Sequence, residues 1–519
     1  MASVSTAAAS LLTVALVFAF LARKRRRSTL PLPPGPRPLP FIGNALDMPS
    51  KEMRTAFREM NEKYGDIVYL DALGQPMIIV GSHEVAVDLL DKRSSNYSDR
   101  GSSAMIDIVG AGWAVTLLRY GEEWRRHRRA IHQYFNAGAV AQYAKSQKLE
   151  THRLVRRLID DPEHFRNHLR HFFGSSALRI SHGIEVDDEP VDYLKIADDA
   201  MDIFAAAFEP GKYLVEIIPW LARMPSWFPG AGAKRDGEVW RPIIYKMVSA
   251  PWDAAMEKMR LGTASPSMVK GLVEQMREDD GPDQLEVIKS AAAVTFAAGS
   301  DTTFSTMQTF FMAMTMYPEV QKKAQDELMA VIGPHRLPEK DDEPSLPYIQ
   351  AITKECIRWR SVVPLNVPHR SLEDDEYKGY FIPKGSIIIT NISAFSHDPI
   401  MYPNPDVFSP ERFLKNGKID PAVHDPATMA FGYGRRVCPG KHFAETSLFI
   451  VIATVLHTLS LSPVVGPDGQ PIMPSGKMTH GLLSYPEPFQ CDIKSRSSEL
   501  EALIRSSCTN MQGVRAAQS

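Results

Sequence analysis

Apolar positions along this 519-residue chain gather into long stretches with helical spacing. The longest covers 285–314 and reads LEVIKSAAAVTFAAGSDTTFSTMQTFFMAM, largely apolar and without a proline. A long helix with so little polar surface is buried, so this stretch predicts a central core helix. A second stretch at 441–459, KHFAETSLFIVIATVLHTL, has the apolar repeat of another long helix.

A polar run, AGSDTT, interrupts the middle of the 285–314 stretch. Glycine weakens a helix, and serine and threonine hydroxyls compete for backbone carbonyls. Gly299, Ser300, Asp301, Thr302 and Thr303 therefore predict a local kink or a widened turn. Departures from local rules inside a core helix often mark function, although a defect tolerated by packing is the alternative.

The N-terminal residues 1–22 form an apolar, almost uncharged segment about as long as the ~20 residues that span a bilayer as a helix. The basic cluster RKRRR at 23–27 follows it, and positive charge on that flank holds the following chain in the cytoplasm. A cleaved signal peptide is the alternative, but its charge would precede the apolar stretch. We therefore predict a single transmembrane anchor with a cytosolic catalytic part.

Residues 23–44 combine this basic stop-transfer cluster with the proline-rich run PLPPGPRPLPFIGN at 31–44. Proline denies helix hydrogen bonds and favours stiff extended backbone, so the run predicts a hinge, with a plain linker as the alternative. No internal repeat or low-complexity tract follows, and residues 45–519 are interpreted as one domain.

The stretch 211–234, GKYLVEIIPWLARMPSWFPGAGAK, is apolar, aromatic and broken by prolines, between two helical patterns. Trp220, Trp227 and Phe228 suit a bilayer interface, where amphipathic rings sit at the level of the headgroups. A hydrophobic loop of the core is the competing interpretation.

Composition narrows the class of protein. Hydrophobic residues make up 44% and charged residues 23%, which argues against disorder and against a polytopic membrane protein. A formal net charge of -2 argues against nucleic acid as the main partner. Cys356, Cys438, Cys491 and Cys508 form no CxxC pair, so neither a disulfide scaffold nor a structural zinc site is expected.

One of these cysteines lies in a distinctive loop, FGYGRRVCPG at 431–440, directly before the predicted helix at 441–459. Cys438 then sits at a helix N-terminus, where free N–H groups and the helix dipole are expected to lower the pKa of a thiol. The loop fits the pattern F-x-x-G-x-R-x-C-x-G through Phe431, Gly434, Arg436, Cys438 and Gly440. The two patterned glycines are expected to let the backbone turn tightly.

Two further spacings place pairs of side chains on one helix face. Glu355 and Arg358 are three apart in KECIRWR, and the run PERF follows downstream at 410–413. Trp124 and Arg128 are four apart in GEEWRRHRR. Each spacing alone is a weak signal.

Together, the cysteine loop, the AGSDTT run, ExxR and PERF resemble the cytochrome P450 family, and the likeness extends over almost the whole chain. The resemblance implies a mainly α fold with small β-sheets (α+β), as a single haem-binding monooxygenase domain over 45–519. Cys438 would be the thiolate ligand of haem b iron, and Asp301 and Thr302 would guide protons to dioxygen.

The resemblance assigns roles to other residues as well. Glu355, Arg358 and Arg412 would form a buried structural triad, and Phe431 would pack against the ligand loop. Contacts to the haem propionates would come from Trp124, Arg128, Arg436 and His369, with Arg370 as the adjacent alternative to the histidine. The apolar walls of a substrate pocket would lie at 101–118, Ala291 to Ala298, Val362 to Val367 and Met478 to Leu483, under a mobile lid at 211–234.

The resemblance also implies partners. No G-x-G-x-x-G opens a helix after a strand, so NADPH would act only through a separate NADPH-cytochrome P450 reductase, with cytochrome b5 as a further donor. Arg125, Arg126, His127 and Arg129 would form a basic helix surface, for which reductase docking and an ordinary solvated face are both open. The substrate would be a lipophilic small molecule and the location the endoplasmic reticulum membrane, as in microsomal fungal enzymes of secondary metabolism or xenobiotic oxidation.

Two rival functions remain open at this point. A haem-thiolate isomerase or dehydratase would rearrange peroxides without a reductase, and the intact pair of Asp301 and Thr302 counts against it. A haem-binding sensor without enzymatic activity is the other, and it would not consume NADPH.

Overall fold

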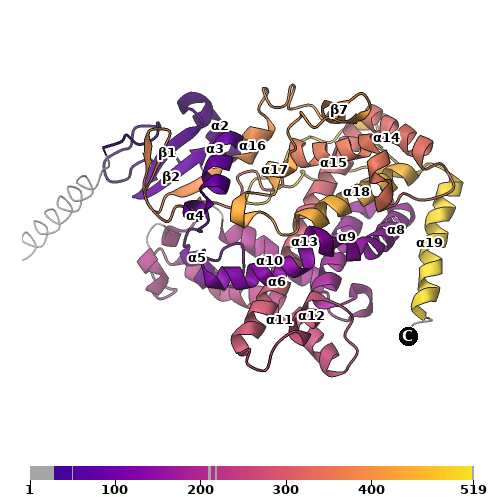
Figure 1. Cartoon of the computed structure of the whole chain (residues 1–519), viewed down its shortest axis with the longest axis horizontal. Helices are drawn as coiled ribbons and strands as arrows, with labels where there is room; N and C mark the ends of the chain where they lie inside the picture. Colours follow the sequence, from indigo (N-terminus) through magenta and orange to yellow (C-terminus); the bar gives the residue numbers. More distant parts are fainter. Residues whose placement is uncertain (1–28, 50, 209–211, 217–218, 517–519) are drawn as a thin grey trace, which may run out of the picture.

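The computed structural model describes residues 29–49, 51–208, 212–216 and 219–516, with side chains up to Thr509 (Figure 1). The α-helices of this part are α2 (Met53–Tyr64), α3 (His83–Ala86), α4 (Ser94–Tyr97), α5 (Ala104–Val109), α6 (Glu122–Phe135), α7 (Ala137–Val140), α8 (Ala144–Asp160), α9 (Phe165–His182), α10 (Tyr193–Ala207), α11 (Gly232–Arg260), α12 (Met268–Glu274), α13 (Pro282–Met316), α14 (Pro318–Val331), α15 (Pro347–Trp359), α16 (Ile392–Ser396), α17 (Ala427–Ala430), α18 (Lys441–Thr458) and α19 (Ser498–Ala516).

Shorter elements connect these helices. The π-helical turn η1 (Val87–Lys92) is joined by the 3-10 turns η2 (Ala141–Tyr143), η3 (Pro162–His164), η4 (Val186–Asp188), η5 (Leu214–Glu216), η6 (Pro219–Arg223), η7 (Lys340–Ser345), η8 (Pro410–Phe413) and η9 (Gly434–Arg436). The strands are β1 (Ile67–Ala72), β2 (Gln75–Val80), β3 (His369–Arg370), β4 (Asp375–Tyr377), β5 (Tyr380–Ile382), β6 (Ile387–Thr390), β7 (Leu414–Lys415), β8 (Lys418–Ile419), β9 (Leu459–Ser462), β10 (Val464–Val465), β11 (Pro471–Ile472) and β12 (Asp492–Ser495).

The largest sheet of the described chain has four strands in the order β1-β2-β6-β3. Strand β2 pairs antiparallel with β1 and parallel with β6, so that Val80 lies opposite Thr390. Strand β3 closes the other edge, with His369 opposite Ile388. The sheet lies at one end of the molecule beside α2 and α3, while most of the helices form the rest of the body (Figure 1). The expected combination of a mainly α fold with small β-sheets is confirmed.

The central helix is α13, which packs against α6, α9, α11, α15 and α18. It begins at Pro282, where the missing N–H and fixed φ of proline suit a first turn. It ends at Met316, one residue before Tyr317, whose following proline disfavours helical backbone. Most of its side chains from Val287 to Thr315 are buried, as expected of a core helix.

The AGSDTT run does not widen this helix, so that part of the expectation is wrong. The helix remains α-helical through the run. The Ser300 hydroxyl donates to the Phe296 carbonyl at 2.7 Å and the Thr302 hydroxyl to the Ala298 carbonyl at 2.9 Å. Both bonds stay within one turn, so the hydroxyls are satisfied without opening the helix.

The predicted anchor at 1–22 and the basic cluster at 23–27 lie outside the described residues. Among the helices that the structure describes, none is long and apolar enough to cross a membrane. The proline-rich run at 31–44 is described and contains no helix or extended strand, only turns and isolated bridges.

Candidate functional site

The cysteine loop leads from α17 through η9 into α18. The Cys438 amide donates to the Phe431 carbonyl at 2.8 Å, which closes the loop on itself. Phe431 is half-buried and packs against the core cluster that contains residues of α15 and α18. A backbone hydrogen bond thus ties Cys438 to Phe431, which is itself packed against the core.

Two glycines of this loop have left-handed backbone, and one of them, Gly434, was expected to shape the turn. Gly434 has φ 53°, and a Cβ there would lie 2.1 Å from the Leu90 carbonyl oxygen, so no other residue fits. Gly432, which the pattern did not single out, has φ 78°. Gly440 has φ -84° as the N-cap of α18, and the Lys441 amide donates to the Cys438 carbonyl, so the chain turns here with backbone that does not require glycine. A Cβ there would meet the Cys438 sulfur at 3.8 Å, which any small side chain tolerates.

Cys438 differs from the other three cysteines in its surroundings. Its side chain is accessible, whereas Cys356, Cys491 and Cys508 are buried. Even so, the surrounding protein desolvates the sulfur and raises the pKa of the thiol, against the lowering effects of the Gly440 and Lys441 N–H groups and of Arg128. The thiol is thus accessible at its surface, although the surrounding protein desolvates it. The expected lowering of its pKa is wrong, because burial outweighs the helix N-terminus.

The central helix has its own accessible stripe. Thr295, Ala298, Gly299 and Thr302 are at least partly accessible in a part of α13 that is otherwise buried. Their spacing of three and four residues places them on one face of the helix. Polar Thr302 thus lies beside the small, apolar surface of Ala298 and Gly299.

Asp301 faces a different side of α13 from Thr302. Its side chain is 2% exposed, and its Oδ1 accepts from Arg170 Nη1 at 2.6 Å. Its Oδ2 accepts the Tyr485 hydroxyl at 2.5 Å. Among the hydrogen bonds of the described chain, none joins Asp301 to Thr302, so the two residues expected to act together are not in direct contact.

Arg170 bridges two carboxylates, since its Nε also pairs with Asp198 of α10 at 3.0 Å. Burial raises the pKa of Asp198 to about 6, helped by repulsion from Asp301, Asp202 and Asp192, although Arg170 opposes this shift. Neither Arg170 nor Tyr485 carries a sequence signal that would have linked it to Asp301.

Three arginines converge near the cysteine loop. Arg436 donates from Nε to the Ser98 carbonyl and from Nη2 to the Leu118 carbonyl, both at 2.8 Å, and its guanidinium carbon lies 4.5 Å from the centre of the Trp124 ring. Its buried Nη1 has no partner. Arg128 follows Trp124 by one turn of α6 and is half-buried.

Arg100 is the third arginine, and the sequence did not single it out. It is 6% exposed and donates to the carbonyls of Thr116 at 3.0 Å and Pro368 at 2.9 Å. Burial, aided by repulsion from Arg436, lowers its pKa to about 9. Burial likewise lowers the pKa of Arg436 to about 10. No ion pair of the described chain neutralises Arg100, Arg128 or Arg436, so this cluster favours an anionic ligand.

His369 lies next to this cluster but in an unsuitable state for the predicted contact. Its Nδ1 donates to the Tyr97 carbonyl at 2.7 Å. Burial, with repulsion from Arg100 and Arg436, lowers the pKa of the ring well below its ordinary value. A neutral ring that uses its only N–H in this way has no donor left for a carboxylate. The predicted propionate contact from His369 stays a prediction, and it would need the second ring nitrogen to be protonated.

The predicted basic surface of α6 is smaller than expected. Arg125 and Arg129 are exposed, but His127 is 5% exposed and bonds to the Glu123 carbonyl. Arg126 is half-buried and donates to Gln284 at 3.2 Å. Residues three or four apart share a helix face, so four neighbouring positions cannot all face solvent on a packed helix. The inclusion of His127 is wrong.

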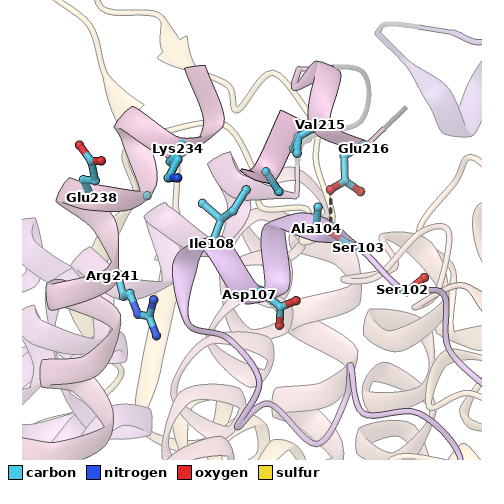
Figure 2. Close-up of a pocket in the computed structure, with 12 residues that line it drawn as sticks. Ser102, Ser103, Ala104, Asp107, Ile108, Val215, Glu216, Lys234, Glu238 and Arg241 are labelled. Atoms are coloured by element: carbon cyan, nitrogen blue, oxygen red, sulfur yellow. Dashed lines mark hydrogen bonds between the residues drawn. The ribbon is translucent and has the colours of Figure 1, made fainter. Parts of the chain in front are cut away.

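A surface cavity of about 560 Å³ lies where α5, η5 and α11 meet (Figure 2). Its lining combines residues of the predicted pocket wall at 101–118 with residues of the predicted lid at 211–234, and α11 contributes Glu238 and Arg241. Glu216 of η5 accepts from the Ser103 hydroxyl at 2.8 Å and from the Met105 amide at 3.2 Å, which ties the two segments together. Nearby, Trp220 is 52% and Trp227 77% exposed, whereas Phe228 is half-buried.

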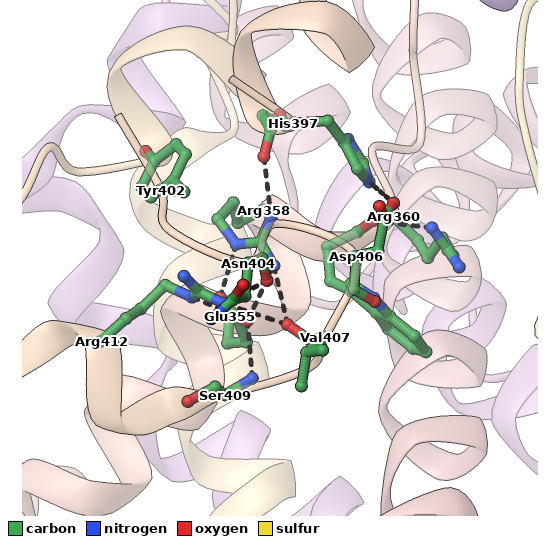
Figure 3. Close-up of polar contacts among 12 residues, drawn as sticks. Glu355, Arg358, Arg360, His397, Tyr402, Asn404, Asp406, Val407, Ser409 and Arg412 are labelled. Atoms are coloured by element: carbon green, nitrogen blue, oxygen red, sulfur yellow. Dashed lines mark hydrogen bonds and ion pairs between the residues drawn. The ribbon is translucent and has the colours of Figure 1, made fainter. Parts of the chain in front are cut away.

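The predicted triad forms a buried network where α15 packs against η8 (Figure 3). Glu355 and Arg358 are both fully buried and form two hydrogen bonds, at 2.7 and 2.8 Å. Arg412 Nε and the Ser409 amide also donate to Glu355, at 3.1 and 2.8 Å. Arg358 and Arg412 donate onward to backbone carbonyls, so every charge in the network is hydrogen-bonded. The predicted structural triad is confirmed.

The sequence model of the cytochrome P450 family matches residues 33–493. The chain belongs to the cytochrome P450 family. Its P450 relatives include the cytochrome P450 monooxygenases COX1 and COX2 of Coprinopsis cinerea. COX1 is 42% identical over 479 residues, which cover 90% of this chain and 92% of COX1, and COX2 is 39% identical over 92% of this chain and 91% of COX2. The tryptamine 4-monooxygenase of Psilocybe cyanescens is 39% identical over 89% of this chain and 92% of that protein.

Family membership establishes this P450 as a haem-thiolate monooxygenase, with electrons that reach the haem from NADPH through a reductase. The local chemistry fits the cofactor. Cys438 offers an accessible sulfur, the stripe on α13 offers a surface without bulky side chains, and the arginine cluster offers unneutralised positive charge for two propionates. The unpartnered Nη1 of Arg436 is a buried donor that a propionate would satisfy.

Proposed function

We propose that this P450 is a membrane-anchored enzyme of fungal secondary metabolism or xenobiotic oxidation that inserts one oxygen atom into a lipophilic small molecule. Cys438 holds the haem iron. The observation that carries this assignment is the accessible but desolvated thiol of Cys438, which its three fellow cysteines do not match.

The haem would be held from two sides. Cys438 would bind it from the loop before α18, and Arg128, Arg436 and Arg100 would pair with its propionates. The ring of Trp124 would support the guanidinium of Arg436, which lies over it. The haem supplies oxygen activation, which thiolate ligation favours by donating electron density. The protein supplies position, charge and a shielded space.

Proton handling falls to α13. The Thr302 hydroxyl lies on the accessible stripe and donates to the Ala298 carbonyl, so its oxygen can accept from water. To pass a proton along, the O–H would turn away from that carbonyl as the oxygen accepts a proton from water. Asp301, one residue earlier, is held on another side by Arg170 and Tyr485. Because no direct bond joins the two, at least one water molecule connects them in the proposed relay.

Thr302→Ala should uncouple the enzyme. With reductase, NADPH and 7-ethoxycoumarin as lipophilic probe, the wild-type enzyme is expected to form oxidised product, whereas the variant should keep consuming NADPH and release hydrogen peroxide. We expect product per NADPH to fall about tenfold or more, because positioned proton transfer commonly contributes about 10²–10⁴-fold. The measurement is the ratio of product and peroxide to NADPH consumed.

The matched control is Thr303→Ala, which makes the same change one residue further along, at a buried position off the accessible stripe. Its coupling should stay near that of the wild type. Equal coupling in Thr302→Ala and wild type would remove Thr302 from the relay. A wild type that consumes no NADPH with reductase would favour the isomerase or the sensor instead.

Substrate would enter through the cavity between α5, η5 and α11 (Figure 2). The exposed rings of Trp220 and Trp227 beside it suit a bilayer interface, which supports a lid that dips into the membrane and admits lipophilic molecules. The four predicted walls of the inner pocket are mostly apolar, so shape rather than ion pairing would position the substrate.

The membrane assignment rests on the sequence. The apolar segment 1–22 and the basic cluster 23–27 would anchor the enzyme in the endoplasmic reticulum as a single-pass protein, with 45–519 in the cytosol. The proline-rich run at 31–44 would act as the hinge between anchor and catalytic domain.

Electrons would come from NADPH-cytochrome P450 reductase, with cytochrome b5 as a further donor. The docking surface would centre on exposed Arg125 and Arg129 of α6 and on Arg435 of the cysteine loop. Arg125 and Arg435 both lie over the Tyr120 ring, at 5.8 and 5.4 Å from its centre, so this surface is continuous with the loop that carries Cys438. Basic charge next to the loop would attract an acidic reductase.

Charge reversal at this surface should slow haem reduction by reductase. We expect Arg125→Glu with Arg129→Glu to reduce the rate several-fold at about 0.01 M salt, and the loss to shrink at 0.15 M, where the Debye length is about 8 Å. Stopped-flow spectroscopy under carbon monoxide measures the rate of haem reduction. Lys322→Glu, an equal reversal at an exposed site on α14, is the control. Equal rates of haem reduction in the α6 variant and the control at low salt would rule out this docking surface.

A further inference from the structure

The segment from Met478 to Pro486 folds back on itself as a short loop. Met478 forms an isolated bridge with Pro486, and the Thr479 amide donates to the Tyr485 carbonyl at 2.7 Å. The Tyr485 amide returns a bond to the Thr479 hydroxyl at 2.9 Å. The turn between them contains Gly481 with φ 138° and two leucines, and it belongs to the pocket wall expected at Met478 to Leu483.

Two hydrogen bonds fasten the base of this loop to the central helix. The Ser305 hydroxyl donates to the Ser484 carbonyl at 2.5 Å, and the Tyr485 hydroxyl donates to Asp301 Oδ2 at 2.5 Å. Ser305 and Asp301 are one turn apart on α13, so both bonds meet the same helix face. The hydrogen bond from Ser305 only holds the loop in place, whereas the one from Tyr485 ends on Asp301, the acidic residue of the AGSDTT run.

The hydrogen bond from Tyr485 determines how many carboxylate oxygens of Asp301 can pair with Arg170. Arg170 Nη1 bonds to Oδ1 alone, while Tyr485 holds Oδ2. A guanidinium prefers to grip both oxygens of a carboxylate through a planar fork. With the phenol hydroxyl gone, Oδ2 would be free for Arg170 to take, and Asp301 would turn further from the Thr302 side of the helix.

We propose that Tyr485 is a positioning residue that keeps Asp301 from bidentate capture by Arg170 and thereby ties a substrate-contacting loop to proton delivery. The inference rests on the proposed relay role of Asp301 and on the proposed pocket wall. The phenol hydroxyl donates only a hydrogen bond and keeps its proton, because burial and the charge of Asp301 raise its pKa above the ordinary value.

The test compares Tyr485→Phe with Ser305→Ala in the full-length, haem-loaded enzyme with reductase and 7-ethoxycoumarin. Both variants remove one hydroxyl that fastens the same loop, but only the first touches Asp301. We expect Tyr485→Phe to raise hydrogen peroxide per NADPH several-fold and to enlarge the solvent deuterium isotope effect. Ser305→Ala should leave both near wild type, although the spectral dissociation constant for the probe can change in either variant.

A second comparison separates positioning from folding. In an Asp301→Asn background, Tyr485→Phe should add little further uncoupling, because its effect passes through the carboxylate. Wild-type coupling in Tyr485→Phe, equal uncoupling in Ser305→Ala, or full additivity with Asp301→Asn would each overturn the inference. If Thr302→Ala keeps full coupling while Tyr485→Phe loses it, the alcohol assignment fails and the Tyr485 inference stands.

Discussion

Replacing Cys438 by serine is expected to abolish NADPH-driven oxygenation and the spectrum of a thiolate-ligated haem. Serine keeps the size of the side chain but offers an alcohol that stays protonated and binds iron weakly, so the electron donation that favours O–O cleavage is lost. Part of the haem is expected to stay bound, since the proposed propionate contacts of Arg100, Arg128 and Arg436 would be unchanged. Haem content, the carbonyl spectrum and product formation with reductase measure the effect.

Cys508→Ala is the matched control. Cys508 is a buried thiol in α19, beyond the residues that match the family model. Its loss should leave the spectrum and turnover near wild type and cost only local packing. A Cys438→Ser protein that kept a thiolate spectrum would assign the ligand to another cysteine.

The second large effect is expected at Glu355. Glu355→Ala should lower the free energy of unfolding by about 3–5 kcal/mol, because it strands the fully buried charge of Arg358 and leaves Arg412 without its carboxylate. The Ser409 amide loses its acceptor as well. We expect low haem retention in this variant, since the network holds α15, a helix of the core against which Phe431 of the cysteine loop packs. Urea unfolding followed by circular dichroism measures the loss.

Glu411→Gln provides the contrast within the same PERF run. Glu411 pairs with Lys323 near the surface, where the side chains are 40% and 56% exposed, and such pairs contribute about 0–1 kcal/mol. Glutamine keeps an oxygen that can still accept the Tyr348 hydroxyl. Equal destabilisation by the two variants would show that the buried network does not hold the core as described.

Much of the helical fold could be predicted because each helix carries its signal locally. The stretch expected at 285–314 is α13 at Pro282–Met316, and the one at 441–459 is α18 at Lys441–Thr458. The sheet could not be predicted in this way. Strand β2 pairs with β6, about 300 residues later in the chain, so that Val80 lies opposite Thr390. Nothing in either short run of sequence indicates which strand is its partner.

The candidate site shows the same difference between features that one segment predicts and features that depend on distant segments. Motifs within single segments, through the family resemblance, pointed to Cys438, Trp124, Arg128 and the pair of Glu355 and Arg358, and the structure confirms the pair. Residues that reach the site from distant segments were missed, as with Arg100 and Tyr485, because no local pattern links them to it. Burial of the side chains also overturned two expectations that were based only on neighbouring residues in the sequence. It raises the pKa of Cys438 despite the helix N-terminus, and it removes His127 from the surface.

Asp301 shows why motif and geometry must be combined. The motif pairs it with Thr302, but adjacent residues on a helix point about 100° apart. The structure gives Asp301 its own partners, Arg170 and Tyr485, on another side of α13. In the proposed relay, proton delivery would therefore depend on residues that the motif does not contain.

The most direct test of the assignment of Cys438 is the difference spectrum of dithionite-reduced protein with and without carbon monoxide, recorded for the wild type and for Cys438→Ser. The account predicts a Soret band at the thiolate-carbonyl position in the wild type and its absence in the variant. A folded, haem-loaded wild type without that band, or a variant that retains it, would contradict the central claim that Cys438 holds the iron.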